Sequence, residues 1–78
     1  MLETMTIDDF YDNGYEMSVG VDFNLEFPDE GRVVTIHPFW DEDNPDGSVV
    51  GMNVYENGKY LGNCYDKWEL PEFMEEHK

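Results

Sequence analysis

Apolar and polar residues alternate strictly from Tyr15 to Phe27, and this alternation is the most regular pattern in the chain. The odd positions are apolar or aromatic, namely Tyr15, Met17, Val19, Val21, Phe23, Leu25 and Phe27. The even positions are polar, charged or glycine, namely Glu16, Ser18, Gly20, Asp22, Asn24 and Glu26. A period of two is typical of a strand with one buried and one wetted face. It predicts a long antiparallel strand here, with a bend or bulge at Gly20.

A second strand is predicted from Arg32 to Trp40, where β-branched and aromatic residues follow the turn residues Pro28 to Gly31. Pro38 lacks a backbone N–H, so we expect this part of the strand at an edge, at a bulge or leaving the sheet. The residues from Asp41 to Gly47 combine four acidic side chains with Pro and Gly. This composition predicts an exposed loop.

Two more strands are predicted from Val49 to Glu56 and from about Lys59 to Tyr65. They flank Asn57-Gly58, a pair that favours a type I′ hairpin because both central residues of that turn need positive φ. The hairpin completes a four-stranded antiparallel β-meander.

A short helix is predicted at each end of the chain. Thr6 is a good N-cap, acidic residues follow it, and Gly14 suits the helix end. Pro71 suits the first turn of a C-terminal helix, whose apolar stripe would be Trp68, Leu70, Phe73 and Met74. The sequence therefore predicts an α+β fold in a single domain covering residues 1–78: the four-stranded antiparallel meander with a short N-terminal and a short C-terminal helix.

Net charge constrains the function of this chain more than any motif does. The chain has 78 residues, with 19 Asp and Glu against 4 Lys and Arg, and a formal net charge of -15. Such a charge is also found in disordered chains, but 40% of the residues are hydrophobic and they are arranged in strand-like runs, which favours a folded protein. The few cations are dispersed, so neither direct binding of nucleic acid nor binding to an anionic membrane is expected.

The candidate chemistry is weak. Glu42, Asn44, Asp46 and Gly47 resemble part of a calcium loop, but Asn53 stands where that loop needs a bidentate Glu. The possible soft metal ligands, His37, Cys64 and His77, are far apart in sequence. No nucleophile or cofactor motif is found, so we expect no catalytic residue, no metal and no cofactor. The lone cysteine and the lack of a secretion signal pattern suggest a reducing, cytoplasmic location.

Carboxylates offer the stronger hypothesis. Glu16, Asp22 and Glu26 share the polar face of the first predicted strand, where neighbours two residues apart lie about 6.7 Å from each other, close to the phosphate spacing of nucleic acid. Further carboxylates occur in the acidic loop and on the C-terminal helix, and Trp40, Tyr55 and Tyr60 are candidate aromatic anchors beside them. The predicted partner-binding residues are Glu16, Asp22, Glu26, Asp41, Glu42, Asp43, Asp46, Glu69, Glu72, Glu75 and Glu76.

In size, acidity, its single Cys64 and its compact sheet with acidic helices, the chain resembles small inhibitors that bacteriophages deploy against host defences. These are anti-CRISPR proteins, anti-restriction DNA mimics and uracil-DNA glycosylase inhibitors. The resemblance is one of class, without a shared motif, so it assigns no role to any residue. It implies a non-enzymatic inhibitor that works in the host cytoplasm, with a basic nucleic-acid-binding protein, such as a host nuclease complex, as its partner.

A second hypothesis stays open. The chain would then be a small structural or adaptor domain that binds another protein through a sheet edge or an aromatic patch. Its acidity would serve solubility, or adaptation to a salt-rich or acidic host. The oligomeric state is left open by the sequence.

Overall fold

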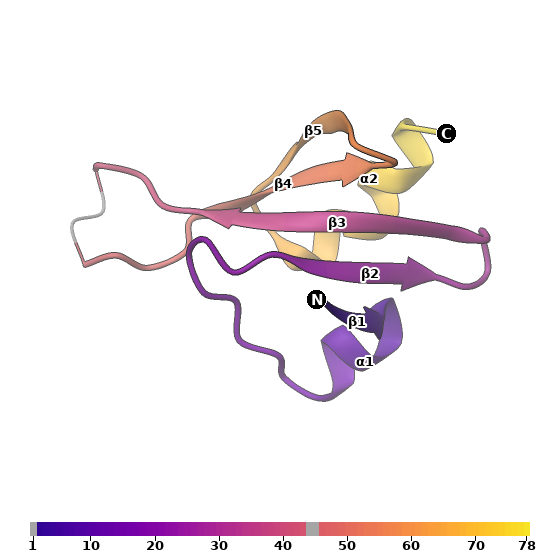
Figure 1. The fold of residues 1–78 in the computed structure, drawn as a ribbon, viewed down its shortest axis with the longest axis horizontal. Helices are drawn as coiled ribbons and strands as arrows, with labels where there is room; N and C mark the ends of the chain where they lie inside the picture. Colours follow the sequence, from indigo (N-terminus) through magenta and orange to yellow (C-terminus); the bar gives the residue numbers. More distant parts are fainter. Residues whose placement is uncertain (1, 44–45) are drawn as a thin grey trace.

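The computed structural model describes residues 2–43 and 46–78, which form a five-stranded sheet and two short α-helices (Figure 1). The strands follow one another across the sheet in chain order. They are β1 (Glu3–Thr6), β2 (Phe23–Phe27), β3 (Arg32–Phe39), β4 (Gly51–Glu56) and β5 (Lys59–Cys64). The helices are α1 (Ile7–Asp12), the 3₁₀ helix η1 (Lys67–Glu69) and α2 (Leu70–Glu76). The predicted α+β class and the antiparallel meander of β2 to β5 are confirmed.

The prediction of four antiparallel strands was wrong because the sheet is mixed. β1 pairs with β2 in parallel, with Glu3 opposite Phe23 and Thr6 opposite Glu26. Helix α1 begins directly after β1, and the Thr6 hydroxyl accepts a hydrogen bond from the Asp9 N–H at 3.1 Å. Thr6 therefore ends a strand and caps a helix, and the connection through α1 lets β1 and β2 run in the same direction.

The single long strand predicted from Tyr15 to Phe27 was also wrong, since only its last five residues form β2. The preceding residues return from the end of α1 and turn at Gly20, which has φ +78°. The Val21 N–H donates to the Ser18 carbonyl at 3.1 Å and closes this turn. The alternating residues thus belong to an irregular segment followed by a strand. The predicted bend at Gly20 is present.

Pro38 lies in β3, opposite Met52 of β4, and its side chain is fully buried. At Pro38, β3 is unpaired on the side of β2, as expected for an edge, but it is paired with β4 on the other side. The Pro38 carbonyl accepts from the Gly20 N–H at 3.3 Å, which places the ring nitrogen on the side of β2. Because the β2–β3 pairing ends at Phe23 and Ile36, no ladder bond is lost there.

The hairpin between β4 and β5 agrees with the sequence prediction. Asn57 has φ 53° and Gly58 has φ +79°, as a type I′ turn requires, and Glu56 lies opposite Lys59. β4 begins at Gly51, two positions after the predicted start, and a bulge follows at Val54 and Tyr55.

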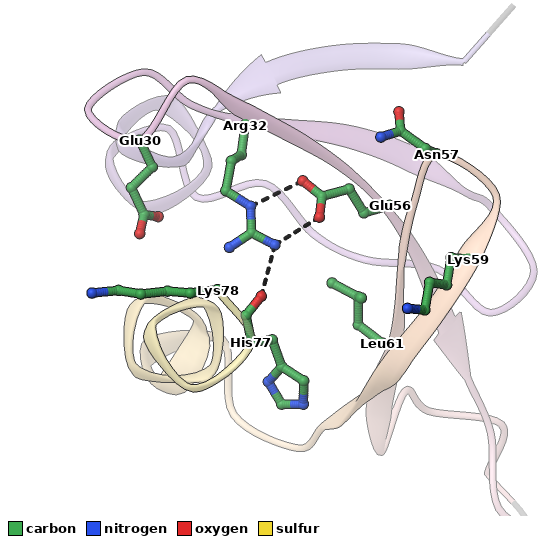
Figure 2. Close-up of a pocket in the computed structure, with 8 residues that line it drawn as sticks. All are labelled: Glu30, Arg32, Glu56, Asn57, Lys59, Leu61, His77 and Lys78. Atoms are coloured by element: carbon green, nitrogen blue, oxygen red, sulfur yellow. Dashed lines mark hydrogen bonds and ion pairs between the residues drawn. The ribbon is translucent and has the colours of Figure 1, made fainter.

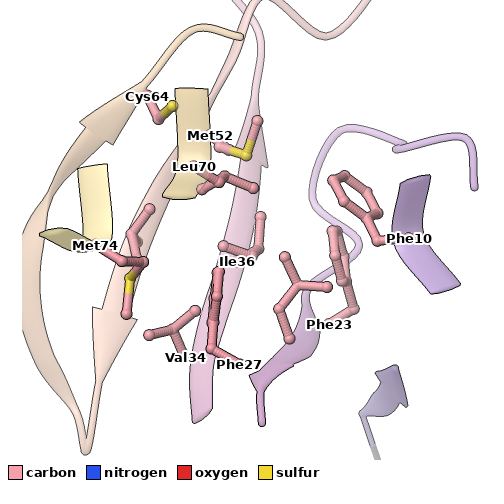
Figure 3. Packing of buried hydrophobic residues seen from close by; sticks show 11 residues of the cluster. Phe10, Phe23, Phe27, Val34, Ile36, Met52, Cys64, Leu70 and Met74 are labelled. Atoms are coloured by element: carbon pink, nitrogen blue, oxygen red, sulfur yellow. The ribbon is translucent and has the colours of Figure 1, made fainter. Parts of the chain in front are cut away.

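The core lies on one face of the sheet, between the strands and the two α-helices (Figure 3). α1 contributes Phe10, while α2 contributes Leu70 and Met74, all fully buried. Pro71 lies in the first turn of α2, as predicted. Trp68 differs from the prediction: it is 60% exposed and stacks on Tyr11 with ring centroids 4.4 Å apart. We call this side of the molecule the helical layer.

Candidate interaction surface

The other face of the sheet is not covered by a helix of the described chain, and we call it the open face. On β2 and β3 the residues that alternate with the core point to it, including Glu26, Val33 and Thr35. Cross-strand pairing continues the open face over β4 and β5, where Thr35 lies opposite Tyr55 and Tyr55 opposite Tyr60. The open face thus extends over the full width of the meander.

Aromatic rings occupy the part of the open face over β3, β4 and β5. The rings of Tyr55 and Tyr60 lie 5.3 Å apart between centroids, and Phe39 meets Tyr65 edge-on at 6.0 Å. Tyr60 is 50% exposed and Tyr65 66% exposed. We refer to these four residues as the aromatic cluster.

Gly51 shows why two of these rings can lie so close to the sheet. A Cβ atom at this position would lie 2.7 Å from Phe39 Cζ and 2.9 Å from Tyr65 Cδ1. The two rings therefore cover the bare backbone of Gly51, which is itself buried. Any side chain at Gly51 would push the rings outward and change the shape of the cluster.

Amides and hydroxyls connect the rest of the open face. The Thr35 hydroxyl donates to Asn24 Oδ1 at 2.8 Å, and the Tyr60 hydroxyl donates to Asn53 Oδ1 at 3.4 Å. Asn63 Nδ2 donates to the Tyr65 hydroxyl at 3.4 Å. These contacts orient the rings and leave further acceptor positions on the amide and hydroxyl oxygens facing solvent.

Two of the predicted partner-binding carboxylates lie on the open face. Asp22 Oδ1 lies 2.5 Å from His37 Nδ1, so the two groups form an ion pair whenever the imidazole is protonated. Glu26 lies opposite the half-exposed Val33. Glu16 belongs to the irregular segment before β2, and Asp22 directly precedes that strand. The prediction that Glu16, Asp22 and Glu26 share the polar face of one strand was therefore wrong. Asp22 and Glu26, four residues apart, are separated by about 13 Å.

The acidic loop joins β3 to β4 and extends beyond the end of the sheet (Figure 1). Asp41, Glu42, Asp43 and Asp46 are all exposed there. Asp46 accepts from the Ser48 N–H at 3.1 Å and from its hydroxyl at 2.7 Å, and these bonds lower the pKa of Asp46. Asn44, part of the calcium-loop comparison, lies outside the described residues. Among the residues described, no cluster of His, Cys, Asp or Glu has the arrangement of a metal site.

The remaining predicted carboxylates, Glu69, Glu72, Glu75 and Glu76, are exposed on η1 and α2. Because α2 packs on the core face, these side chains belong to the helical layer, on the opposite side from the open face. The structure thus brings Asp22 and Glu26 onto one surface and the α2 carboxylates onto another. One continuous line through the whole predicted set is not formed.

Arg32 is a structural residue that sequence reasoning did not single out. Its guanidinium donates to both Glu56 oxygens, from Nε at 2.9 Å and from Nη2 at 2.7 Å (Figure 2). It also donates to the carbonyls of Met74 at 3.2 Å and His77 at 3.0 Å. These bonds raise the pKa of Arg32 and lower that of Glu56. The only signal in the sequence was that Arg32 is its single arginine.

Two lysines of the helical layer also contact neighbouring side chains. Lys67 Nζ lies 5.6 Å from the ring centroid of Phe10 and 5.1 Å from that of Trp68, while Lys78 pairs with Glu75 at 2.5 Å. The Tyr11 hydroxyl donates to the Lys67 carbonyl at 2.8 Å, and burial, with Cys64, Asp66 and Asp8 nearby, raises the pKa of Tyr11 to about 12. The strand residues that we assign to the open face include no Lys or Arg.

Cys64 is a buried thiol whose Sγ donates to the Asp66 carbonyl at 3.1 Å, and burial raises its pKa. It therefore behaves as a packed core residue, not as a reactive thiolate.

None of the helices in the described part of the chain is long and apolar enough to cross a membrane. Comparison with protein-family models, with curated proteins and with solved structures yielded no match.

Proposed function

We propose that this protein is a non-enzymatic acidic inhibitor. It binds a basic, nucleic-acid-handling protein and blocks the nucleic-acid site of that protein by charge mimicry, in the manner of anti-CRISPR or anti-restriction inhibitors. The observation that carries the proposal is the net charge of -15, combined with the contacts that three of the four cations make within the helical layer. Arg32, Lys67 and Lys78 contact groups of the helical layer, so they do little to neutralise carboxylates elsewhere on the surface.

A surface of this kind attracts a cationic groove in two ways. Its field steers the encounter and raises the association rate, and its carboxylates form charge-assisted hydrogen bonds with Arg and Lys once in contact. Asp41, Glu42, Asp43 and Asp46 are exposed beside the end of the sheet, where they are accessible to such a groove. On this proposal the protein needs neither a catalytic residue nor a cofactor, and works where its host nuclease works, in the cytoplasm.

A second candidate is an adaptor domain that binds another protein through apolar contacts, with the acidity serving solubility. The observation that favours it is the open face, where Val33, Tyr60 and Tyr65 are each at least half exposed. Exposed aromatic side chains of this kind are common at the centres of protein interfaces. The two candidates differ in how binding depends on charge.

The experiment that tests the proposal is a pull-down from nuclease-treated bacterial lysate with the tagged protein, followed by identification of the retained proteins. We expect a basic nucleic-acid-binding protein that is released by high salt and displaced by added duplex DNA. The purified partner should also lose its nucleic-acid binding when this protein is added. Retention of partners that neither DNA nor salt displaces would refute mimicry and support the adaptor candidate.

Charge-reversal variants give the matched comparison. Glu42→Lys with Asp43→Lys alters the acidic loop, while Glu72→Lys with Glu76→Lys makes the same change of charge on α2. All four side chains are exposed, so both variants are expected to fold. The loop variant should weaken binding at least tenfold more than the α2 variant. Equal small effects of both would show that neither the loop carboxylates nor those of α2 contact the partner.

A further inference from the structure

The open face exposes Val33, Tyr60 and Tyr65, and its chemistry restricts which partner could cover it. A second copy of this chain would bring another charge of -15 against it, and nucleic acid would add phosphates, so both are repelled. A purely apolar surface would desolvate the carboxylate of Glu26, and it would offer nothing to the hydrogen-bonding positions of the Asn53 and Asn63 amides that Tyr60 and Tyr65 do not use. A protein surface that is cationic and also able to cover aromatic rings fits all three kinds of group.

We propose that the open face is the docking surface for arginine side chains of the basic partner. In this arrangement guanidinium groups lie on the exposed rings of Tyr60 and Tyr65 and donate to the carboxylate of Glu26 and to neighbouring amide oxygens. The inference rests on the proposed function, since that function supplies the basic partner. It adds the surface that holds this partner and the type of side chain that it recognises.

Arginine fits this surface better than lysine for geometric reasons. A guanidinium is flat, stacks on tyrosine rings and donates to a carboxylate with two parallel N–H groups, whereas an ammonium is a strongly hydrated point charge. The carboxylate-binding half of this chemistry already occurs in the helical layer, where the Arg32 guanidinium donates to both oxygens of Glu56.

The spacing of the open face indicates more than one arginine. Glu26 lies on β2 and Tyr55 on β4, two strands apart. They are also two residues out of register, so about 12 Å separates them. Tyr60 lies a further strand away, on β5. One guanidinium cannot stack on Tyr60 and donate to Glu26 at the same time. The partner should therefore present at least two arginines on a flat surface or an extended segment.

The test uses two labelled peptides of equal length and charge, one alternating glycine with arginine and the other alternating glycine with lysine. Binding is measured by fluorescence anisotropy at low salt, and backbone amide shifts in NMR spectra locate the contact. We expect the arginine peptide to bind about tenfold more tightly than the lysine peptide. The amide shifts should lie on β3, β4 and β5 around the aromatic cluster.

The matched variants place the same kind of change on the two faces. Tyr60→Ala with Tyr65→Ala removes the exposed rings of the open face, and Trp68→Ala removes a ring of similar exposure from the helical layer. The first should bring the arginine-to-lysine ratio close to one, and the second should leave it unchanged. Equal affinities of the two peptides for the wild-type protein, or amide shifts confined to α2, would overturn the inference.

The inference and the proposed function can fail separately. If the arginine peptide binds the open face but the lysate yields no DNA-displaceable partner, the proposed function fails and the arginine surface stands. The opposite result is a retained partner whose binding is weakened by reversal of Glu42 and Asp43 and unchanged by the loss of Tyr60 and Tyr65. In that case the inference fails and the inhibitor function stands.

Discussion

Replacing Arg32 by Met tests how the C-terminal helix is held against the sheet. The substitution keeps much of the apolar stem and removes four hydrogen bonds that join β3, the end of β4 and the last turn of α2. It also leaves the Glu56 carboxylate, 22% exposed in its side chain, without its guanidinium partner. The carbonyls of Met74 and His77 lose their donors as well.

The magnitude follows from these losses. Hydrogen bonds to a charged group contribute about 1.5 to 3 kcal/mol each, but the four bonds share one side chain and are not additive. Breaking a fully buried pair costs about 3 to 5 kcal/mol, and the Arg32 side chain is 18% exposed, which reduces the cost. We therefore expect Arg32→Met to lower the free energy of unfolding by about 3 kcal/mol. That is a large part of the few kcal/mol typical of small domains.

The effect should depend on pH with a definite sign. Arg32 lowers the pKa of Glu56 from its ordinary value of 4.5, so the pair stabilises the folded state at neutral pH. As the pH falls below 4.5 and through the lowered pKa, Glu56 becomes protonated and this contribution is lost. The difference in stability between the wild-type protein and Arg32→Met should therefore shrink in acid.

The assay is urea unfolding followed by circular dichroism, because urea, unlike guanidinium, does not screen charge. Lys78→Met is the matched control, since it breaks an exposed ion pair with Glu75 and should leave the free energy of unfolding nearly unchanged. The double variant Arg32→Met with Glu56→Met should recover part of the loss. A cost below about 1 kcal/mol for Arg32→Met, or a cost that does not change with pH, would refute the reasoning.

Three smaller changes test local features by the same unfolding assay. Thr6→Ala removes the N-cap of α1 and should cost about 1 kcal/mol, whereas Thr4→Ala, on the same strand, should cost clearly less; equal costs would contradict the capping role. Gly58→Ala places a Cβ at φ +79° and should cost about 1 kcal/mol, and a neutral result would contradict the type I′ turn. Tyr11→Phe removes the bond to the Lys67 carbonyl and should cost about 1 kcal/mol. Because the pKa of Tyr11 is raised to about 12, its stabilising contribution is lost as pH rises from 10 towards 12, and identical alkaline profiles of the two proteins would contradict this.

Features determined by neighbouring residues could be predicted from the sequence. The type I′ turn at Asn57-Gly58 requires a backbone that few other pairs adopt, and the Thr6 cap needs only the next three residues. β1 could not be predicted in this way. It is four residues long, none of them is fully buried, and its strand character depends on β2, far along the chain. The alternation from Tyr15 to Phe27 likewise contained no sign that strand pairing begins only at Phe23.

The candidate site was less predictable than the fold because it depends on which side of the sheet each residue faces. The carboxylates could be found by composition, but their division between the open face and the helical layer needs the packing of α2. The role of Gly51 is visible only when the rings of Phe39 and Tyr65 are seen to lie over it. Similarly, Arg32 meets Glu56 and the end of α2 only after three distant segments come together.

Because of the parallel pairing of β1, we expect the N-terminal segment to unfold before the meander of β2 to β5. β2 to β5 are joined one to the next in sequence, so their pairings close comparatively short loops, whereas β1 is attached to the sheet through β2 alone. The N-terminal segment is held further by α1, through Phe10, which is fully buried against Phe23, and through Tyr11, which bonds the Lys67 carbonyl. Local unfolding can release this segment while the meander persists, and it would turn β2 into a temporary sheet edge able to pair with another chain.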